Sequence, residues 1–156
     1  MSSDMTIHRG LYFEEFEVGQ KVYTPGRTIT EADIVNFAGL SGDYTQIHTD
    51  YEFAQSTPIG KRFAHGLLIM AIASGLAART GVLEGTVLVF REIKNWKFMN
   101  PVFIGDTIHV VMEVLNTKEL RRAGAGAVTI ELRVINQKDE VAMKGEWNIL
   151  MALRPE

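Results

Sequence analysis

The amino-acid sequence predicts an α+β domain in which an antiparallel β-sheet wraps around a long central α-helix. Three observations lead to this prediction. Helical patterns lie in the first half of the chain, four strand-like segments with short connections follow them, and residues 65–79 are apolar on nearly every face. Strands joined by short connections pair antiparallel, and an apolar helix of this length needs protein on most sides, so the sheet should enclose it.

Length and composition indicate one globular domain. A chain of 156 residues can bury a substantial core but is short for two independent domains. With 46% hydrophobic and 22% charged residues, the composition is that of an ordinary globular protein. We expect residues 1–9 to form a flexible lead-in and residues 10–154 to form a single domain.

Charge and residue usage argue against several kinds of partner and site. The net charge of −3 offers no basic surface for nucleic acid. The longest apolar run, residues 67–78, is too short to cross a bilayer, so no membrane association is expected. Cysteine is absent, which is compatible with a cytoplasmic location, and no metal-binding or dinucleotide-binding motif occurs. We therefore expect neither a metal nor a bound cofactor.

The first helix is expected to start at Thr30. Asp33 follows this residue by three positions, a pattern typical of a capped helix start, and glycines at positions 39 and 42 should end the helix. A short helical turn should then begin at Thr49 or Asp50 and end near Pro58. A loop over residues 57–64 leads into the buried helix.

The second half of the chain has the two-residue period of strands with one buried face. Apolar residues alternate with polar ones in three segments, and a fourth long segment precedes them. Residues 137–139 form the expected hairpin turn before the last strand. The predicted strands cover residues 86–98, 108–114, 128–134 and 141–149.

One polar stretch, LSGDYTQIHTD at residues 40–50, stands out because it places Asp43 five positions before His48. On spacing alone, Gly42 and Asp43 could form a turn in which the carboxylate bonds its own backbone. His48 alone could equally be a structural histidine near a helix start. The basic pairs at residues 61–62 and 121–122 are expected to be solvated surface.

Four segments together resemble one known family. GDYTQIH at residues 42–48 resembles the G-D-x-N-P-[hydrophobic]-H signature of the MaoC-like, R-specific enoyl-CoA hydratases, and FAHGLL at residues 63–68 resembles their H-G pair before the central helix. NPVFIGD at residues 100–106 resembles their P-V-x-x-G-D segment, and FEVGQ at residues 16–20 resembles their opening strand. The resemblance implies the hot-dog fold, which agrees with the periodicity.

The resemblance also implies an enzyme that hydrates a trans-2-enoyl-CoA to an (R)-3-hydroxyacyl-CoA, or runs the reverse dehydration. This chemistry needs a base for water and a proton for the α-carbon, and a carboxylate and an imidazole sharing one water can supply both. Asp43 and His48 would hold that water, while the backbone N–H of Gly66 would stabilise the thioester oxygen as a further catalytic group. The expected substrate-binding residues are Thr45, His65, Ala64 and Phe63, with His65 also orienting the loop.

Some positions depart from the family pattern. Thr45 and Gln46 replace the usual Asn and Pro, although a threonine hydroxyl can still form hydrogen bonds. Ala71 takes the place expected for a serine on the central helix. We expect partial burial next to apolar neighbours, such as Ile47 and Phe53, to tune the pKa of Asp43.

Two other functions remain open. Thioesterases of the hot-dog group often carry an acidic residue on the central helix, but residues 67–78 contain none. A non-catalytic acyl-CoA-binding module is supported only by the departures at Thr45 and Gln46. In each case we expect an acyl-CoA partner and at least a homodimer, since one copy leaves an open sheet edge, with the acyl chain bound near the interface.

Overall fold

The computed structural model describes residues 9–155, so the predicted flexible lead-in lies outside the described residues apart from Arg9. Six strands, four α-helices and two single 3-10 turns make up the described chain. In order, they are η1 (Phe13–Glu15), β1 (Lys21–Tyr23), β2 (Arg27–Thr28), α1 (Glu31–Ser41), α2 (Gln46–Thr49), α3 (Tyr51–Gln55), α4 (Gly66–Arg79), β3 (Val87–Phe98), β4 (Thr107–Leu120), η2 (Arg121–Ala123), β5 (Ala125–Ile135) and β6 (Val141–Ala152).

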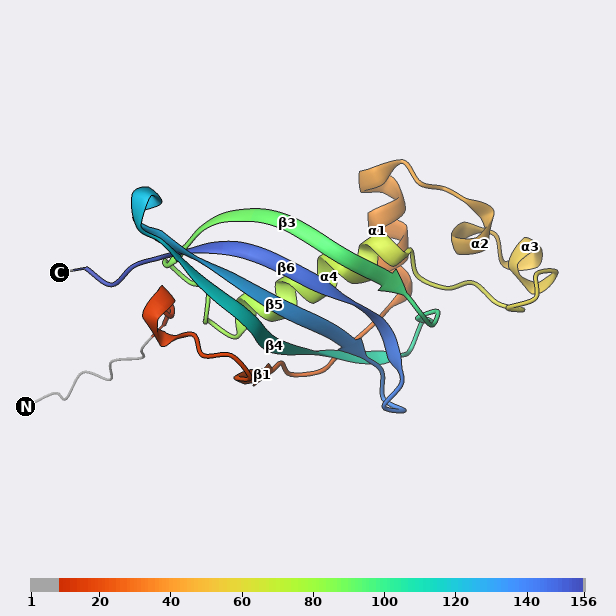
Figure 1. Ribbon diagram of the computed structural model, residues 1–156. Helices are drawn as coiled ribbons and strands as arrows, with labels where there is room; N and C mark the ends of the chain where they lie inside the picture. The colour runs from red at the N-terminus through yellow and green to blue at the C-terminus, as the bar shows by residue number, and fades with distance from the viewer. Residues whose placement is uncertain (1–8, 156) are drawn as a thin grey trace, which may run out of the picture.

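The strands form one antiparallel sheet that curves around α4 (Figure 1). The strand order is β1-β4-β5-β6-β3, and the short β2 also pairs with β4. The helices α1, α2 and α3 extend past one end of the sheet, on the side where α4 begins (Figure 1). The predicted α+β architecture is confirmed.

The core lies between α4 and the inner face of the sheet. Along β5, the alternating apolar residues at positions 128, 130, 132 and 134 are at most 2% exposed. From the helix, Ile69, Ala73 and Leu76 are also at most 2% exposed and belong to the same cluster. Both periodicities seen in the sequence therefore meet in one core, as expected for a sheet and a helix that each bury one side.

The start and end of α1 follow from its capping residues. The hydroxyl of Thr30 accepts a hydrogen bond from the Asp33 N–H, and the Asp33 carboxylate accepts one from the Thr30 N–H. Gly42 ends the helix in the left-handed conformation, with φ of 78°. This ending places Asp43 directly after the helix.

Two local predictions are corrected. Residues 16–20 do not form the opening strand, because residues 17–20 make a turn in which the Gln20 N–H donates to the Glu17 carbonyl and Gly19 has φ of 91°. The strand starts one residue later, at Lys21. The predicted turn capped by Asp50 is confirmed as α3, but the sequence did not predict α2.

The strand β3 lies at the edge of the sheet and pairs only with β6 among the described strands. Its apolar side chains at positions 87–90 and 93 are 40–53% exposed. Nothing in residues 9–155 covers this edge. No helix in the described part of the chain has both the length and the hydropathy to span a bilayer.

Candidate active site

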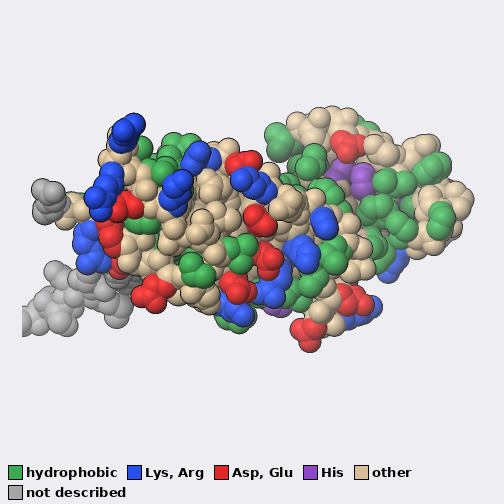
Figure 2. All heavy atoms as spheres, viewed as in Figure 1, with side chains coloured by type: hydrophobic (Ala, Val, Ile, Leu, Met, Phe, Trp, Pro, Cys, Tyr) green, Lys and Arg blue, Asp and Glu red, His purple; other side chains and the backbone are tan. Residues whose placement is uncertain are grey.

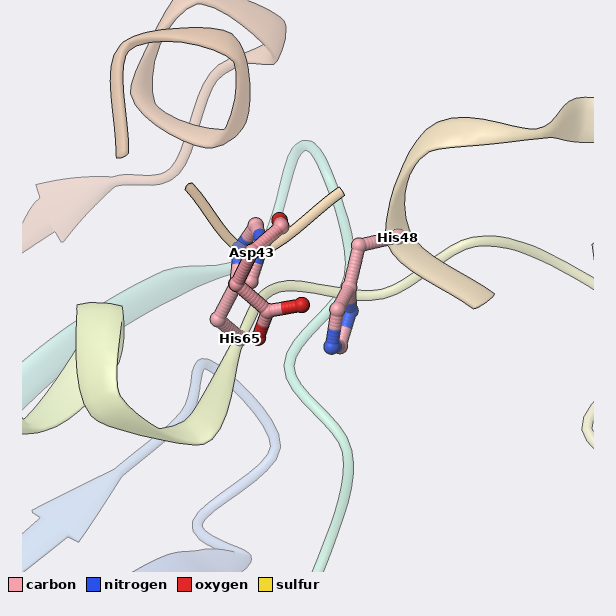
Figure 3. Close-up of side chains that lie close together, drawn as sticks. All are labelled: Asp43, His48 and His65. Carbon is pink, nitrogen blue, oxygen red and sulfur yellow. The ribbon is translucent and has the colours of Figure 1, made fainter. Parts of the chain in front are cut away.

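Three side chains from separate parts of the chain meet at the end of the sheet where α4 begins. Asp43 follows α1, His48 lies on α2, and His65 is the N-cap residue of α4. One nitrogen of each ring and a carboxylate oxygen of Asp43 all lie within 4.8 Å of one another (Figure 3). In Figure 3 the carboxylate points toward the ring of His48. The fold thus brings together the two residues predicted to hold a water.

Asp43 is partly exposed, and hydrogen bonds from its neighbour Thr45 lower its pKa. The carboxylate oxygen Oδ1 accepts hydrogen bonds from the Thr45 hydroxyl at 2.5 Å and from the Thr45 N–H at 3.1 Å. These bonds, led by the hydroxyl, lower the pKa of Asp43 and outweigh the smaller opposing effect of burial. Our expectation that apolar burial tunes this pKa is therefore wrong, since hydrogen bonds dominate. Asp43 is ionised at neutral pH.

His48 is held as a neutral proton acceptor. Its Nδ1 lies 2.7 Å from the carbonyl oxygen of Phe63. Because a carbonyl can only accept, Nδ1 carries the hydrogen and Nε2 has a free lone pair. The residue is 7% exposed, and burial is the main cause that lowers its pKa from 6.5. At neutral pH the site therefore combines a carboxylate with an uncharged imidazole.

His65 contacts both members of this pair. The ring is 2% exposed, and its Nε2 donates to the backbone carbonyl of Asp43 at 2.9 Å. Its centroid lies 4.0 Å from that of His48, with an angle of 32° between the rings, and 4.9 Å from that of Phe37. The ring therefore packs against the pair, and its expected role of orienting the loop stays a prediction.

An apolar cavity of about 500 Å³ opens beside the pair. Figure 2 shows histidine side chains next to a group of hydrophobic ones at this end of the molecule. His48, Gly66, Phe63 and Ala64 line the cavity, whereas Asp43, Thr45 and His65 are not among its described lining residues. Thr45 contacts Asp43 instead, so its predicted place in substrate binding is indirect.

Gly66 is the first residue of α4, and its N–H is one of the groups that have no acceptor within the helix. The absence of a side chain at Gly66 leaves space beside the start of the helix. The structure places the Phe98 ring there: a Cβ at Gly66 would lie 2.6 Å and 2.8 Å from two ring carbons. With Phe98 in this position, which is 57% exposed, only a glycine fits at residue 66.

The sequence did not predict the role of Arg62, which we expected on the solvated surface. Its guanidinium donates to both carboxylate oxygens of Glu31, at 2.8 Å and 2.6 Å, and reaches the His48 carbonyl at 3.5 Å. The ion pair lowers the pKa of Glu31 and raises that of Arg62. These contacts link α1 and α2 to the loop before α4. The ion pair joins residues 31 positions apart, so no local pattern in the sequence could predict it.

The cluster of Asp43, His48 and His65 has the donor types of a transition-metal site. Each imidazole already donates a hydrogen bond from one ring N–H to a backbone carbonyl, as metal-binding histidines also do. The two rings lie close together, with centroids 4.0 Å apart and planes tilted by 32°. The absence of a metal stays a prediction.

The comparisons with known proteins identify relatives along most of the chain. The profile of the MaoC-like domain matches residues 14–136. A 3-hydroxybutyryl-CoA dehydratase of Methylorubrum extorquens is 35% identical over 88% of this chain and 82% of its own length. An (R)-specific enoyl-CoA hydratase of Rhodospirillum rubrum is 34% identical over 72% of this chain and 74% of its own. Protein MaoC of Klebsiella aerogenes is 44% identical over 64% of this chain, but this chain spans only 29% of that protein.

Solved structures agree with the fold. An Archaeoglobus protein described as a monoamine oxidase regulatory protein superposes with a TM-score of 0.88 and 37% identity, covering 94% of this chain and 98% of that one. A Mycobacterium tuberculosis protein with a double hotdog fold superposes with a TM-score of 0.83 over 94% of this chain and 46% of its own. At 18% identity, the second likeness shows the fold alone. The predicted hot-dog fold is confirmed.

Proposed function

The chain belongs to the MaoC-like domain family, and from this membership we propose that it is a hydro-lyase acting on coenzyme A thioesters. The proposed reaction adds water to a trans-2-enoyl-CoA to give an (R)-3-hydroxyacyl-CoA, or runs in reverse. The observation that carries the proposal is the pairing of an ionised Asp43 with a neutral His48, which lines an apolar cavity. The (R)-specific relative supports the stereochemistry.

The pair can orient one water molecule for attack. Both the Asp43 carboxylate and Nε2 of His48 are acceptors, so a water between them can donate one hydrogen to each. The oxygen lone pairs of that water then face the double bond. In the hydration direction, a bond forms between the water oxygen and the β-carbon, one O–H bond breaks, and the proton passes through the pair to the α-carbon.

The start of α4 can stabilise the charge that forms during this step. As the water adds, negative charge moves to the thioester oxygen. The N–H of Gly66 lies at the positive end of the α4 dipole and lines the same cavity as His48. Phe98 faces this glycine, and so we expect its ring to form one wall next to the thioester.

We propose that the active form is a homodimer or a higher homo-oligomer. The apolar edge strand β3 is exposed along its length, and α4 exposes the small residues Ala71, Ser74, Gly75 and Ala78 on one face. An uncovered strand edge with apolar side chains favours pairing with a second chain. Light scattering that gives the mass of one chain would contradict this proposal. The cytoplasmic location stays a prediction.

The alternatives have less support. No acidic residue lies on α4, so the carboxylate expected of a thioesterase is missing from that helix. One observation favours a non-catalytic acyl-CoA-binding role. Asp43 is not among the described residues that line the cavity. Turnover decides between this role and the hydro-lyase.

The test is an assay of purified protein with trans-2-enoyl-CoA esters, following the loss of absorbance of the conjugated thioester. We expect turnover that depends on both Asp43 and His48, with the (R) product identified by chiral chromatography. If enoyl esters bind without turnover, the protein is a binding module. Release of free coenzyme A would instead identify a thioesterase.

A further inference from the structure

The cavity continues beyond His48 and Gly66 to a closed, apolar floor. Four lining residues are 1–3% exposed, so they belong to the rigid core. Four others are 43–62% exposed and form the rim. The floor consists of Ala64, Ile69, Val102 and Met143, and the rim of Ile59, Leu67, Phe98 and Met99. A chain that enters past the catalytic pair therefore ends against packed side chains.

Apart from the Gly66 N–H at the thioester end, the cavity lining offers no partner to a charged group of the substrate. Its described lining residues include no Lys, Arg, Asp or Glu, and His48 is uncharged at neutral pH. The two cations on the adjoining loop are engaged elsewhere: Lys61 lies 3.7 Å from the centre of the Phe103 ring, and Arg62 is paired with Glu31. The amide N–H₂ of Asn100 donates to the Val141 carbonyl at 2.8 Å. Burial of a carboxylate here would be strongly unfavourable.

The volume sets a length for the group that fits. If a methylene takes about the volume of a water molecule, ~30 Å³, four carbons fill roughly a quarter of the cavity and eight to ten carbons fill about half or more. Each additional buried methylene favours binding roughly fourfold, or about 0.8 kcal/mol. A short acyl group would therefore leave most of the available apolar contact unused.

We propose that this protein selects uncharged enoyl-CoA esters of about eight to ten carbons over four-carbon and carboxylated ones. The inference rests on the proposed function, since it assigns the substrate class of the same site. The thioester lies at Gly66, next to the ring of Phe98, and the hydrocarbon tail extends across the floor toward Val102 and Met143. The relative named for a four-carbon substrate is thus expected to differ from this chain in preference.

The experiment compares kcat/KM for three trans-2-enoyl-CoA esters: four carbons, eight carbons, and five carbons with a terminal carboxylate. We expect the eight-carbon ester to exceed the four-carbon ester at least tenfold and the carboxylated ester at least a hundredfold. A four-carbon ester that equals or exceeds the eight-carbon ester overturns the proposal. So does a carboxylated ester within tenfold of the eight-carbon one.

A variant of the cavity floor tests where the hydrocarbon tail lies. Val102→Phe fills the end of the cavity and is expected to lower kcat/KM for the eight-carbon ester at least tenfold, while the four-carbon ester changes less than threefold. Val18→Phe makes the same substitution at a position that is 65% exposed and should change neither. Equal losses for the two esters in a folded Val102→Phe protein would contradict the placement of the tail.

A binding measurement separates this proposal from the proposed function. Calorimetry with the saturated octanoyl-CoA and butanoyl-CoA needs no turnover, and we expect octanoyl-CoA to bind at least tenfold more tightly. If no enoyl ester were turned over, the proposed function would fail, but this preference would still support the assigned tail site. Equal affinities for the two saturated esters would overturn the assignment whether or not the protein is active.

Discussion

The candidate site is built from two parts of the molecule that are held in different ways. Asp43 and His48 lie on the segment of α1, α2 and α3, which extends beyond the sheet (Figure 1). Gly66 and the cavity floor belong to α4 and the curved sheet, where the side chains are packed into the core. The reacting groups thus lie on the segment beyond the sheet, Asp43 just after α1 and His48 on α2, and the groups that bind the substrate lie on the packed scaffold.

Besides the Arg62–Glu31 ion pair and the ring contacts of His65, two hydrogen bonds to backbone carbonyls connect these parts. His48 donates to the Phe63 carbonyl, and His65 donates to the Asp43 carbonyl. Each bond joins the segment to the residues just before α4. The position of the pair relative to Gly66 therefore depends on these polar links as well as on the packing of α1, whose Ile34 belongs to the core.

The largest effect should come from the pair itself. Asp43→Asn and His48→Ala each remove an acceptor of the proposed water, and each should lower kcat about 10²- to 10⁴-fold. In the first variant an amide oxygen can still accept from Thr45, and so the local fold should persist. Steady-state kinetics checks the loss, and the circular dichroism spectrum serves as the control for folding. Turnover close to wild type in both variants would show that the pair is wrongly assigned.

Gly66→Ala tests the scaffold side of the comparison. The added methyl would overlap two carbons of the Phe98 ring, which is half exposed and can turn away. We expect the free energy of unfolding to change by less than about 1 kcal/mol, because no buried group is displaced. Turnover should fall about 10- to 100-fold, since the ring next to the thioester moves. Combining the variant with Phe98→Ala removes the overlap, and an undiminished loss in this double variant would contradict the steric explanation.

The sequence predicted the scaffold well because its signals are local. The alternation of β5, the all-round apolar character of α4 and the capping pair Thr30 and Asp33 each depend on residues a few positions apart. The sequence also named Asp43, His48 and Gly66, but through the resemblance to a family. Spacing alone left a simple turn as an equally good explanation of Asp43.

The links between the two parts could not be predicted from the sequence. The bond from His65 to Asp43 spans 22 positions, and that from Arg62 to Glu31 spans 31. The Phe98 ring over Gly66 joins residues 32 positions apart, one on β3 and one on α4. The pKa of Asp43 depends on a hydroxyl two residues away, which we had considered for substrate binding instead.

His65→Phe tests a link directly and should have an intermediate effect. The phenyl ring can keep the packing on His48 and Phe37 but has no N–H to donate to the Asp43 carbonyl. Loss of about one net hydrogen bond corresponds to a roughly five- to tenfold decrease in kcat. Because the electrostatic interaction with His65 is one of the smaller causes that lower the pKa values of Asp43 and His48, both pKa values should rise.

The pH profile separates this positioning role from a purely structural one. Wild-type activity should fall on the acid side below pH 6.5, where the lowered pKa of His48 lies. The free energy of unfolding should also decrease below pH 6.5, since there His48 binds a proton more readily in the unfolded chain than in the folded one. In His65→Phe the acid limb should move to higher pH, whereas His65→Gln, which can still donate, should restore part of kcat. A lower rate with an unchanged profile in His65→Phe would mean that the ring only packs.

Thr45→Val should have the smallest effect on turnover. It tests the pKa of Asp43 separately from the position of the pair. Without the hydroxyl, Asp43 loses the main cause of its lowered pKa, which should rise toward its ordinary value of 3.8. The carboxylate remains ionised at pH 7, so kcat should change less than about twofold, as with most surface substitutions. Carbon-detected NMR titration measures the pKa directly, and Thr45→Ser, which keeps the hydroxyl, should leave it low. A large loss of kcat at pH 7 would show that Thr45 acts on the substrate or the water as well as on Asp43, and the indirect role assigned to it would be wrong.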